Sequence, residues 1–141
     1  MFGWLKPKLP FGLNDSRALP IAQAVTQLLK LQLVACGGVA ALPDLLRRPM
    51  VRGYVVGIYD AAAQLSGLRL NDERQFLAYM QLCHAELLRG VLEDPAAFAA
   101  ASLLTQAMPE FMEGQELGGR EYFQWSEDRS AMPMGLARWL H

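Results

Sequence analysis

Residues 53–68, GYVVGIYDAAAQLSGL, contain one charged residue, Asp60, in a segment that otherwise has the composition of a buried helix. Together with the residues just before it, this stretch predicts a helix over about 50–66, with successive side chains rotated by about 100°. An apolar face is then formed by Val51, Val55, Ile58, Ala62 and Leu65. Nearly opposite, a second face is formed by Gly53, Gly57, Asp60 and Gln64. Both faces therefore need neighbouring elements.

The glycines on this helix indicate a close approach of another backbone. A glycine inside a helix costs about 1 kcal/mol relative to alanine, so Gly53 and Gly57 make sense mainly where a side chain would not fit. A second predicted helix, which begins at Pro109, has the same device, since one of its faces carries Phe111, Gly114, Gly118, Tyr122 and Trp125. We predict that the two glycine faces meet, unless the second helix breaks at Gly118 and Gly119. Its other face is expected in solvent and carries Glu110, Glu113, Glu116, Arg120 and Gln124.

Helical periodicity also dominates the rest of the chain, with few β-branched residues and no convincing period-two alternation. The sequence therefore predicts an all-α fold, a compact single-domain bundle of six to seven helices over residues 16–141 that follows an N-terminal arm at 1–15. The remaining helices are expected at about 16–37, 43–48, 71–93, 95–108 and 133–139, with N-caps among Asn14, Asp15 and Ser16, at Asn71, and at Asp94.

The composition leaves an apolar surplus that something must cover. Apolar residues make up 52% of the chain and charged residues 19%, against about 25% charged in typical soluble domains. A large core, a subunit interface or a membrane-facing strip would account for this surplus. The net charge of −1 gives no attraction to nucleic acid. Arg47, Arg48 and Arg52 form the only basic cluster, which either contacts a phosphate or carboxylate or is a solvated corner.

Several features bear on the compartment. The apolar tracts are too interrupted for a signal peptide or a transmembrane helix, and Cys36 and Cys83 lack CxxC spacing and are expected as core residues. These features predict a cytoplasmic protein. The N-terminal MFGWLKPK, residues 1–8, has the composition of an interfacial membrane anchor or of a segment that docks in a groove. The alternative for this arm is a tail that folds back on its own domain.

Asp60 has two possible roles. On the small-residue face it would be partly out of water, and a buried carboxylate needs a partner. The structural alternative is that it accepts hydrogen bonds and fixes the packing, with partners among Arg52, Arg120, Tyr122 and Trp125. The functional alternative is a ligand pocket that Asp60 forms with Tyr54, Tyr59, Tyr122 and Trp125.

No motif for catalysis, metal or cofactor binding is present. His84 lies in an apolar helical face without a second metal ligand at helical spacing, so we expect a hydrogen-bonded core histidine. The serines lack a nucleophile motif, and no glycine-rich phosphate loop occurs. The sequence therefore favours a non-enzymatic protein that acts by protein–protein contacts, as a homodimer or a partner-binding module. The alternative is a small-molecule-binding protein or enzyme with the pocket around Asp60.

Overall fold

The computed structural model describes residues 13, 15–34, 38–90 and 94–139, and within them the protein is helical without strands. The predicted all-α bundle is confirmed. The elements are α1 (Ala18–Val34), the short 3₁₀ helix η2 (Val39–Ala41), α2 (Leu42–Leu45), α3 (Pro49–Leu65), α4 (Glu73–Leu87), α5 (Pro95–Thr105), α6 (Pro109–Glu127) and α7 (Gly135–Trp139).

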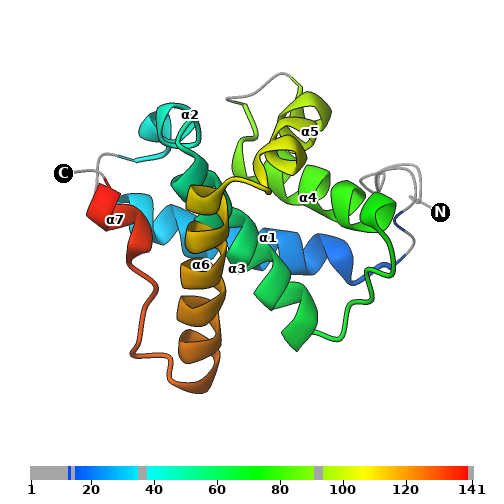
Figure 1. Cartoon of the computed structure of the whole chain (residues 1–141). Helices are drawn as coiled ribbons and strands as arrows, with labels where there is room; N and C mark the ends of the chain where they lie inside the picture. Colours follow the sequence, from blue (N-terminus) through cyan, green and yellow to red (C-terminus); the bar gives the residue numbers. More distant parts are fainter. Residues whose placement is uncertain (1–12, 14, 35–37, 91–93, 140–141) are drawn as a thin grey trace.

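Helix α3 lies at the centre of the bundle (Figure 1). It contacts α6 along its length and also packs against α1, α4, α5 and α7, while α1 and α4 pack on each other. Every residue from Val51 to Tyr59 is buried, so all sides of the helix have neighbours there. Leu65, expected on the apolar face, is instead 48% exposed, because the helix ends there and its last turn projects beyond the bundle.

The crossing of α3 and α6 is built on glycine. Gly53 and Gly57 on α3 face the backbone of α6, and Gly114 and Gly118 on α6 face the backbone of α3. An ideal Cβ at any of the four would stand within 2.9 Å of a carbonyl carbon of the opposite helix. The backbones are therefore in direct contact, and no side chain larger than hydrogen fits between them. Helix α6 runs unbroken through Gly118 and Gly119 to Glu127.

Helix boundaries follow the expected caps with two corrections, both on α4. The Asp94 side chain accepts a hydrogen bond from the main-chain N–H of Ala97 and caps α5 as predicted. On α4, however, the cap is Asp72 and not Asn71, and the helix ends at Leu87, short of residue 93. Gly90 follows with a φ of 78°, a left-handed conformation that glycine adopts readily at helix ends.

The polar face predicted for α6 is in solvent, since its five residues Glu110, Glu113, Glu116, Arg120 and Gln124 are all exposed. Of the predicted N-terminal arm, only Leu13 and Asp15 belong to the described residues. The possible membrane contact through residues 1–8 and the expected core position of Cys36 lie outside them. None of the described helices has the length and apolar character that a membrane span requires.

Candidate functional site

Helix α3 carries two buried groups of polar side chains, and the first surrounds Tyr54. The Tyr54 hydroxyl donates to Glu121 Oε1 at 2.6 Å and accepts from Gln32 Nε2 at 3.1 Å. Main-chain N–H groups at the start of α7 complete the network. Those of Met134 and Gly135 each donate to Glu121 Oε1 at 3.1 Å. We call Gln32, Tyr54 and Glu121 the Tyr54 cluster.

The Tyr54 cluster joins four helices. Its side chains come from α1, α3 and α6, and the donors at residues 134–136 hold α7 against them, including the Leu136 N–H on Gln32 Oε1 at 3.1 Å. Burial, together with the hydrogen bond to Glu121, raises the pKa of Tyr54 far above its ordinary value. The hydroxyl therefore stays protonated and acts as a fixed donor.

The second group lies where α3, α4 and α5 meet, and its centre is His84. The Tyr59 hydroxyl is 3.0 Å from His84 Nδ1, and the Ser102 hydroxyl oxygen is 3.1 Å from His84 Nε2. Arg52 Nη1 donates to the same Ser102 oxygen at 2.9 Å. We call Arg52, Tyr59, His84 and Ser102 the His84 cluster.

The hydrogen-bond partners fix the proton positions in the His84 cluster. Ser102 donates its hydroxyl proton to the Phe98 carbonyl oxygen at 3.2 Å, so it accepts from both Arg52 and His84. His84 then carries its proton on Nε2 and accepts from Tyr59 on Nδ1, which leaves every group paired. Burial, with a smaller effect of the Arg52 charge, lowers the pKa of His84 to about 3. The ring is therefore neutral, as expected for a core histidine.

A serine beside a histidine can act as a nucleophile and its base, but this pair does not have that arrangement. His84 and Ser102 are both fully buried, with 0% exposure, so no substrate reaches them. The histidine nitrogen that faces Ser102 bears a proton and cannot accept another. The His84 cluster is therefore part of the core.

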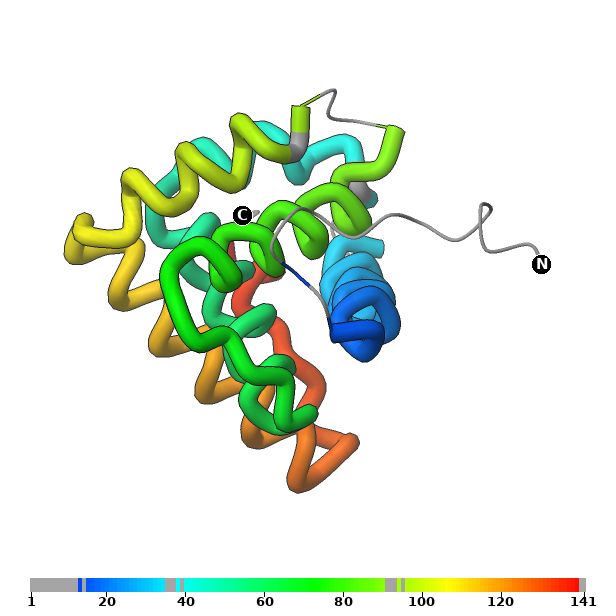
Figure 2. Tube along the Cα trace, turned by 90° about the vertical axis from the view of Figure 1, so that its right-hand side faces the viewer, coloured from blue at the N-terminus to red at the C-terminus, as the bar shows by residue number. Residues whose placement is uncertain are grey.

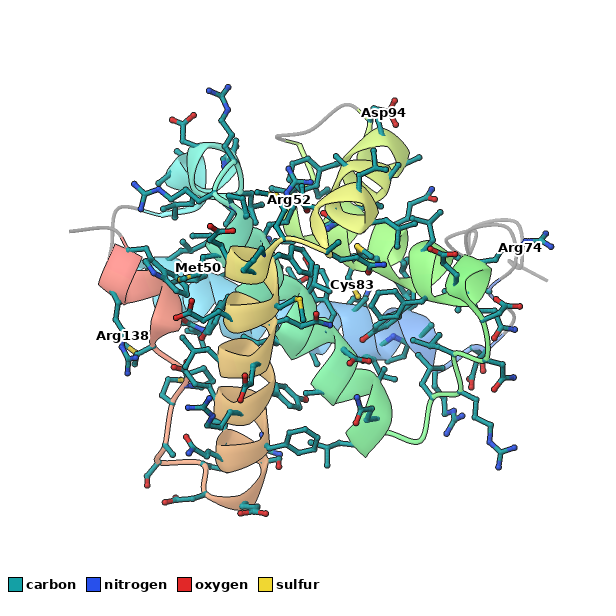
Figure 3. The ribbon with its side chains drawn as sticks, viewed as in Figure 1. Met50, Arg52, Arg74, Cys83, Asp94 and Arg138 are labelled. Atoms are coloured by element: carbon teal, nitrogen blue, oxygen red, sulfur yellow. The ribbon has the colours of Figure 1, made fainter. Side chains whose placement is uncertain are left out.

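Arg52 supplies the only charge in the His84 cluster. Its guanidinium donates to the carbonyl oxygens of Leu46 and Phe98 at 3.0 and 3.1 Å and lies over the Phe98 ring at 4.1 Å. Figure 3 shows it between the start of α3 and helix α5. Among the described residues no carboxylate pairs with it. The carbonyl oxygens of Leu46 and Phe98 and the face of the Phe98 ring stabilise the positive charge of Arg52 instead.

The structure does not bring the three predicted anion-contact arginines together. Arg52 is buried in the His84 cluster, whereas Arg47 forms a surface ion pair with Asp44 at 3.8 Å. Arg48 donates to the carbonyl oxygen of Trp139 at 3.1 Å. The three guanidinium groups therefore make contacts in three different parts of the structure.

The predicted pocket around Asp60 is not assembled either. Tyr54 and Tyr59 belong to different clusters, and Tyr122 packs on Trp125 with the ring centres 5.6 Å apart. Asp60 is half-buried, which raises its pKa. Its hydrogen-bond partner is Gln64 on its own helix, at 3.0 Å. The prediction of a hydrogen-bond partner for Asp60 from outside its own helix turn is wrong. The expected partners make other contacts instead; they are Arg52, Arg120, Tyr122 and Trp125.

Sequence analysis misses Gln32 and Glu121, the two polar residues that complete the Tyr54 cluster. Glu121 is 8% exposed, although it resembles its solvated neighbours on α6 in composition. The available signal is spacing, because Glu121 follows Gly118 by three residues and so shares the glycine face. Gln32 follows buried Leu28 and Leu29 by four and three residues in the same way.

Among the described residues, no group of histidine, cysteine and carboxylate side chains could hold a metal ion. No protein-family model matches the chain, and neither a curated protein nor a solved structure does.

Acid should destabilise the protein through His84. Its pKa of about 3 in the fold lies below the ordinary 6.5, so the unfolded chain binds more protons between these values. The contribution of His84 to the free energy of unfolding is complete above pH 6.5 and falls with pH, by up to about 1.4 kcal/mol per pH unit. Urea unfolding near pH 7 and near pH 5 should therefore differ by about 2 kcal/mol.

The control for this experiment is His84→Gln, which cannot titrate in that range. The pH dependence between these two conditions should largely disappear in the variant. Asp60, whose raised pKa acts in the opposite direction, is present in both proteins. An equal loss of stability in the variant would show that His84 is not the titrating group.

Proposed function

We propose that the protein acts by protein–protein contact, as a homodimer, through the outer side of α5 and the turn that follows it. No residue from Pro95 to Pro109 is charged. Leu104 is 84% exposed, Met108 40% and Met112 57%. Figure 2 places the α5–α6 turn at an outer edge of the molecule. We define the α5 surface as the exposed residues Ala96, Ala97, Ala100, Leu104, Met108 and Met112.

The shape of the α5 surface supports a second helix as its partner. The alanines occupy one side of α5 at helical spacing and lead to Leu104, so a neighbouring helix can approach closely, with the larger side chains packed at the end. Methionine adapts readily to different contact surfaces. An apolar patch of this kind is more typical of an interaction site than of a free surface.

The absence of charge within the α5 surface favours another copy of the same chain. A twofold interface brings the same patch together from both subunits, and like charges would then oppose one another. A surface without charged residues avoids that repulsion and offers nothing that would select a partner of opposite charge. The free thiol of Cys83 suits a reducing compartment, so we place the dimer in the cytoplasm.

The rival proposal, an enzyme or ligand-binding protein with a pocket at Asp60, has less support. Its residues lie in separate contacts, and the hydrogen bonds of both buried clusters are internal. The single observation that favours the contact proposal is the exposure of three large apolar side chains, Leu104 on α5, Met108 in the turn and Met112 in the first turn of α6.

Sedimentation equilibrium over micromolar concentrations tests this proposal. The native protein should approach a mass of twice the chain's 15.6 kDa, whereas Leu104→Lys should remain monomeric, because two lysines would meet in a dry interface. Leu31→Lys is the matched control, since Leu31 is 57% exposed on α1, and it should dimerise like the native protein. A native protein that stays monomeric would overturn the homodimer, as would an effect of Leu31→Lys equal to that of Leu104→Lys.

A further inference from the structure

Two of the three large side chains on the α5 surface are methionines, Met108 in the turn and Met112 in the first turn of α6. Methionine differs from leucine in one reaction, because a peroxide oxidises its thioether to a sulfoxide. Both methionines are exposed in the single chain, whereas Met80 and the thiol of Cys83 are buried. Peroxide therefore reaches the sulfur atoms of Met108 and Met112 more easily than these two buried ones.

A sulfoxide on the α5 surface would have no side-chain donor to pair with. The six side chains that define this surface are those of alanine, leucine and methionine, and none of them carries an N–H or O–H group. In a twofold dimer the facing surface is the same one, so the second subunit adds no side-chain donor. Burial of a polar group without a hydrogen bond is unfavourable. The oxygen that oxidation adds to a methionine therefore opposes the contact between the two copies.

We infer that oxidation of Met108 and Met112 is a reversible switch that separates the two copies, an inference that rests on the homodimer proposed above. In each oxidation the O–O bond of hydrogen peroxide breaks, one oxygen atom forms the S–O bond of the sulfoxide, and the other leaves as water. The sulfur loses two electrons and the peroxide gains them. A thiol-dependent reductase reverses the change, since two thiols are oxidised to a disulfide and the sulfoxide oxygen leaves as water.

The switch acts on the free subunit. Met108 and Met112 are covered in the proposed dimer and open in the free subunit, so peroxide reacts with them there. Their oxidation then opposes reassociation, to which both subunits contribute both sulfoxides. Met132 and Met134 are similarly exposed but lie away from α5, so their sulfur atoms stay open in either state. Dilution of the protein should therefore speed the oxidation of the first pair and leave that of the second pair unchanged.

The test follows the dimerisation and the oxidation of the full chain together. Sedimentation equilibrium gives the dissociation constant before and after treatment with hydrogen peroxide, and mass spectrometry of proteolytic peptides gives the oxidised fraction of each methionine. Once Met108 and Met112 are fully oxidised, the dissociation constant should rise at least about hundredfold, the loss expected for two or more unpaired buried acceptors. Treatment with methionine sulfoxide reductase and a dithiol should restore the original value.

Two double variants locate the effect. Met108→Leu with Met112→Leu keeps the surface apolar and removes both thioethers, so this protein should dimerise and should remain a dimer in peroxide. Met132→Leu with Met134→Leu is the matched control, because it removes the same number of exposed thioethers away from α5. The control should dimerise like the native protein and lose the dimer in peroxide. General damage to the fold would affect both variants equally.

The outcomes separate the switch from the proposed homodimer. A native protein that is monomeric before oxidation overturns the homodimer and the switch together. A dimer of unchanged affinity after full oxidation of Met108 and Met112 overturns the switch alone. Dissociation of the variant with Met108→Leu and Met112→Leu in peroxide also overturns the switch, because the oxidised group responsible would then lie elsewhere.

Discussion

Gly118→Ala is expected to lower the free energy of unfolding by about 3 kcal/mol, while Gly119→Ala, at the next position of α6, is expected to raise it by about 1 kcal/mol. The two variants add the same methyl group to the same helix. At Gly118 its carbon would collide with the Tyr54 carbonyl, with the carbonyl carbon 2.9 Å away. At Gly119 the nearest atom is the Gly57 carbonyl oxygen at 3.7 Å, an ordinary contact.

The opposite signs follow from two competing effects. Alanine is the better helix former at both positions, so only close packing can reverse its advantage. At Gly118 the obstacle is the main chain of α3, which cannot rotate away as a side chain can, so the helices must separate. Urea unfolding of both variants measures the difference. A gain of stability in Gly118→Ala would mean that α3 and α6 do not touch at this point.

Glu121→Ala is expected to lower the free energy of unfolding by about 3 kcal/mol. Three donors, the Tyr54 hydroxyl and the N–H groups of Met134 and Gly135, lose their common acceptor Glu121 Oε1. The start of α7 is then held only by the remaining hydrogen bonds of Gln32 and Tyr54. Loss of packing between α7 and Tyr54 should accompany the change in stability.

The matched control for this variant is Glu113→Ala on the same helix. Glu113 is exposed, so its removal should change the stability by no more than about 0.5 kcal/mol. Glu121→Gln keeps an acceptor oxygen and should give an intermediate value. Thermal or urea unfolding of the three variants suffices. Equal values for Glu121→Ala and Glu113→Ala would contradict the role of the Tyr54 cluster.

The sequence predicts the α3–α6 contact because its cause is local. Glycines spaced four apart, at Gly53 and Gly57 and at Gly114 and Gly118, are costly in a helix unless another backbone approaches. The caps at Asp94 and the start at Pro109 are local in the same sense. Helical spacing therefore predicts the fold class and most of the helix positions.

The polar clusters cannot be predicted in this way, because the partners come from distant parts of the chain. Tyr54 and Glu121 are 67 residues apart, and Arg52 meets Ser102 at a separation of 50 residues. Helical spacing places Asp60 on the glycine face of α3. Its hydrogen-bond partner, however, is Gln64, one turn later on the same helix. Pairing of this kind depends on how the helices are placed in three dimensions, which no local pattern contains.

The proposed function lies on the surface of the protein, at the exposed side of α5. Both buried clusters on α3 are occupied by hydrogen bonds within the fold, while the α5 surface remains apolar and open. We propose that the outer side of α5 meets a second copy of the chain. This contact between two copies can be detected by a measurement that reports on individual positions of that surface.

Methionine methyl NMR over a dilution series is that measurement, because the side chains needed are already present. The methyl signals of Met108 and Met112 should shift with concentration at micromolar values. Met132 and Met134, 40% and 42% exposed away from α5, and the buried Met80 should not. Shifts absent at Met108 and Met112, or confined to Met132 and Met134, would contradict the proposed interface.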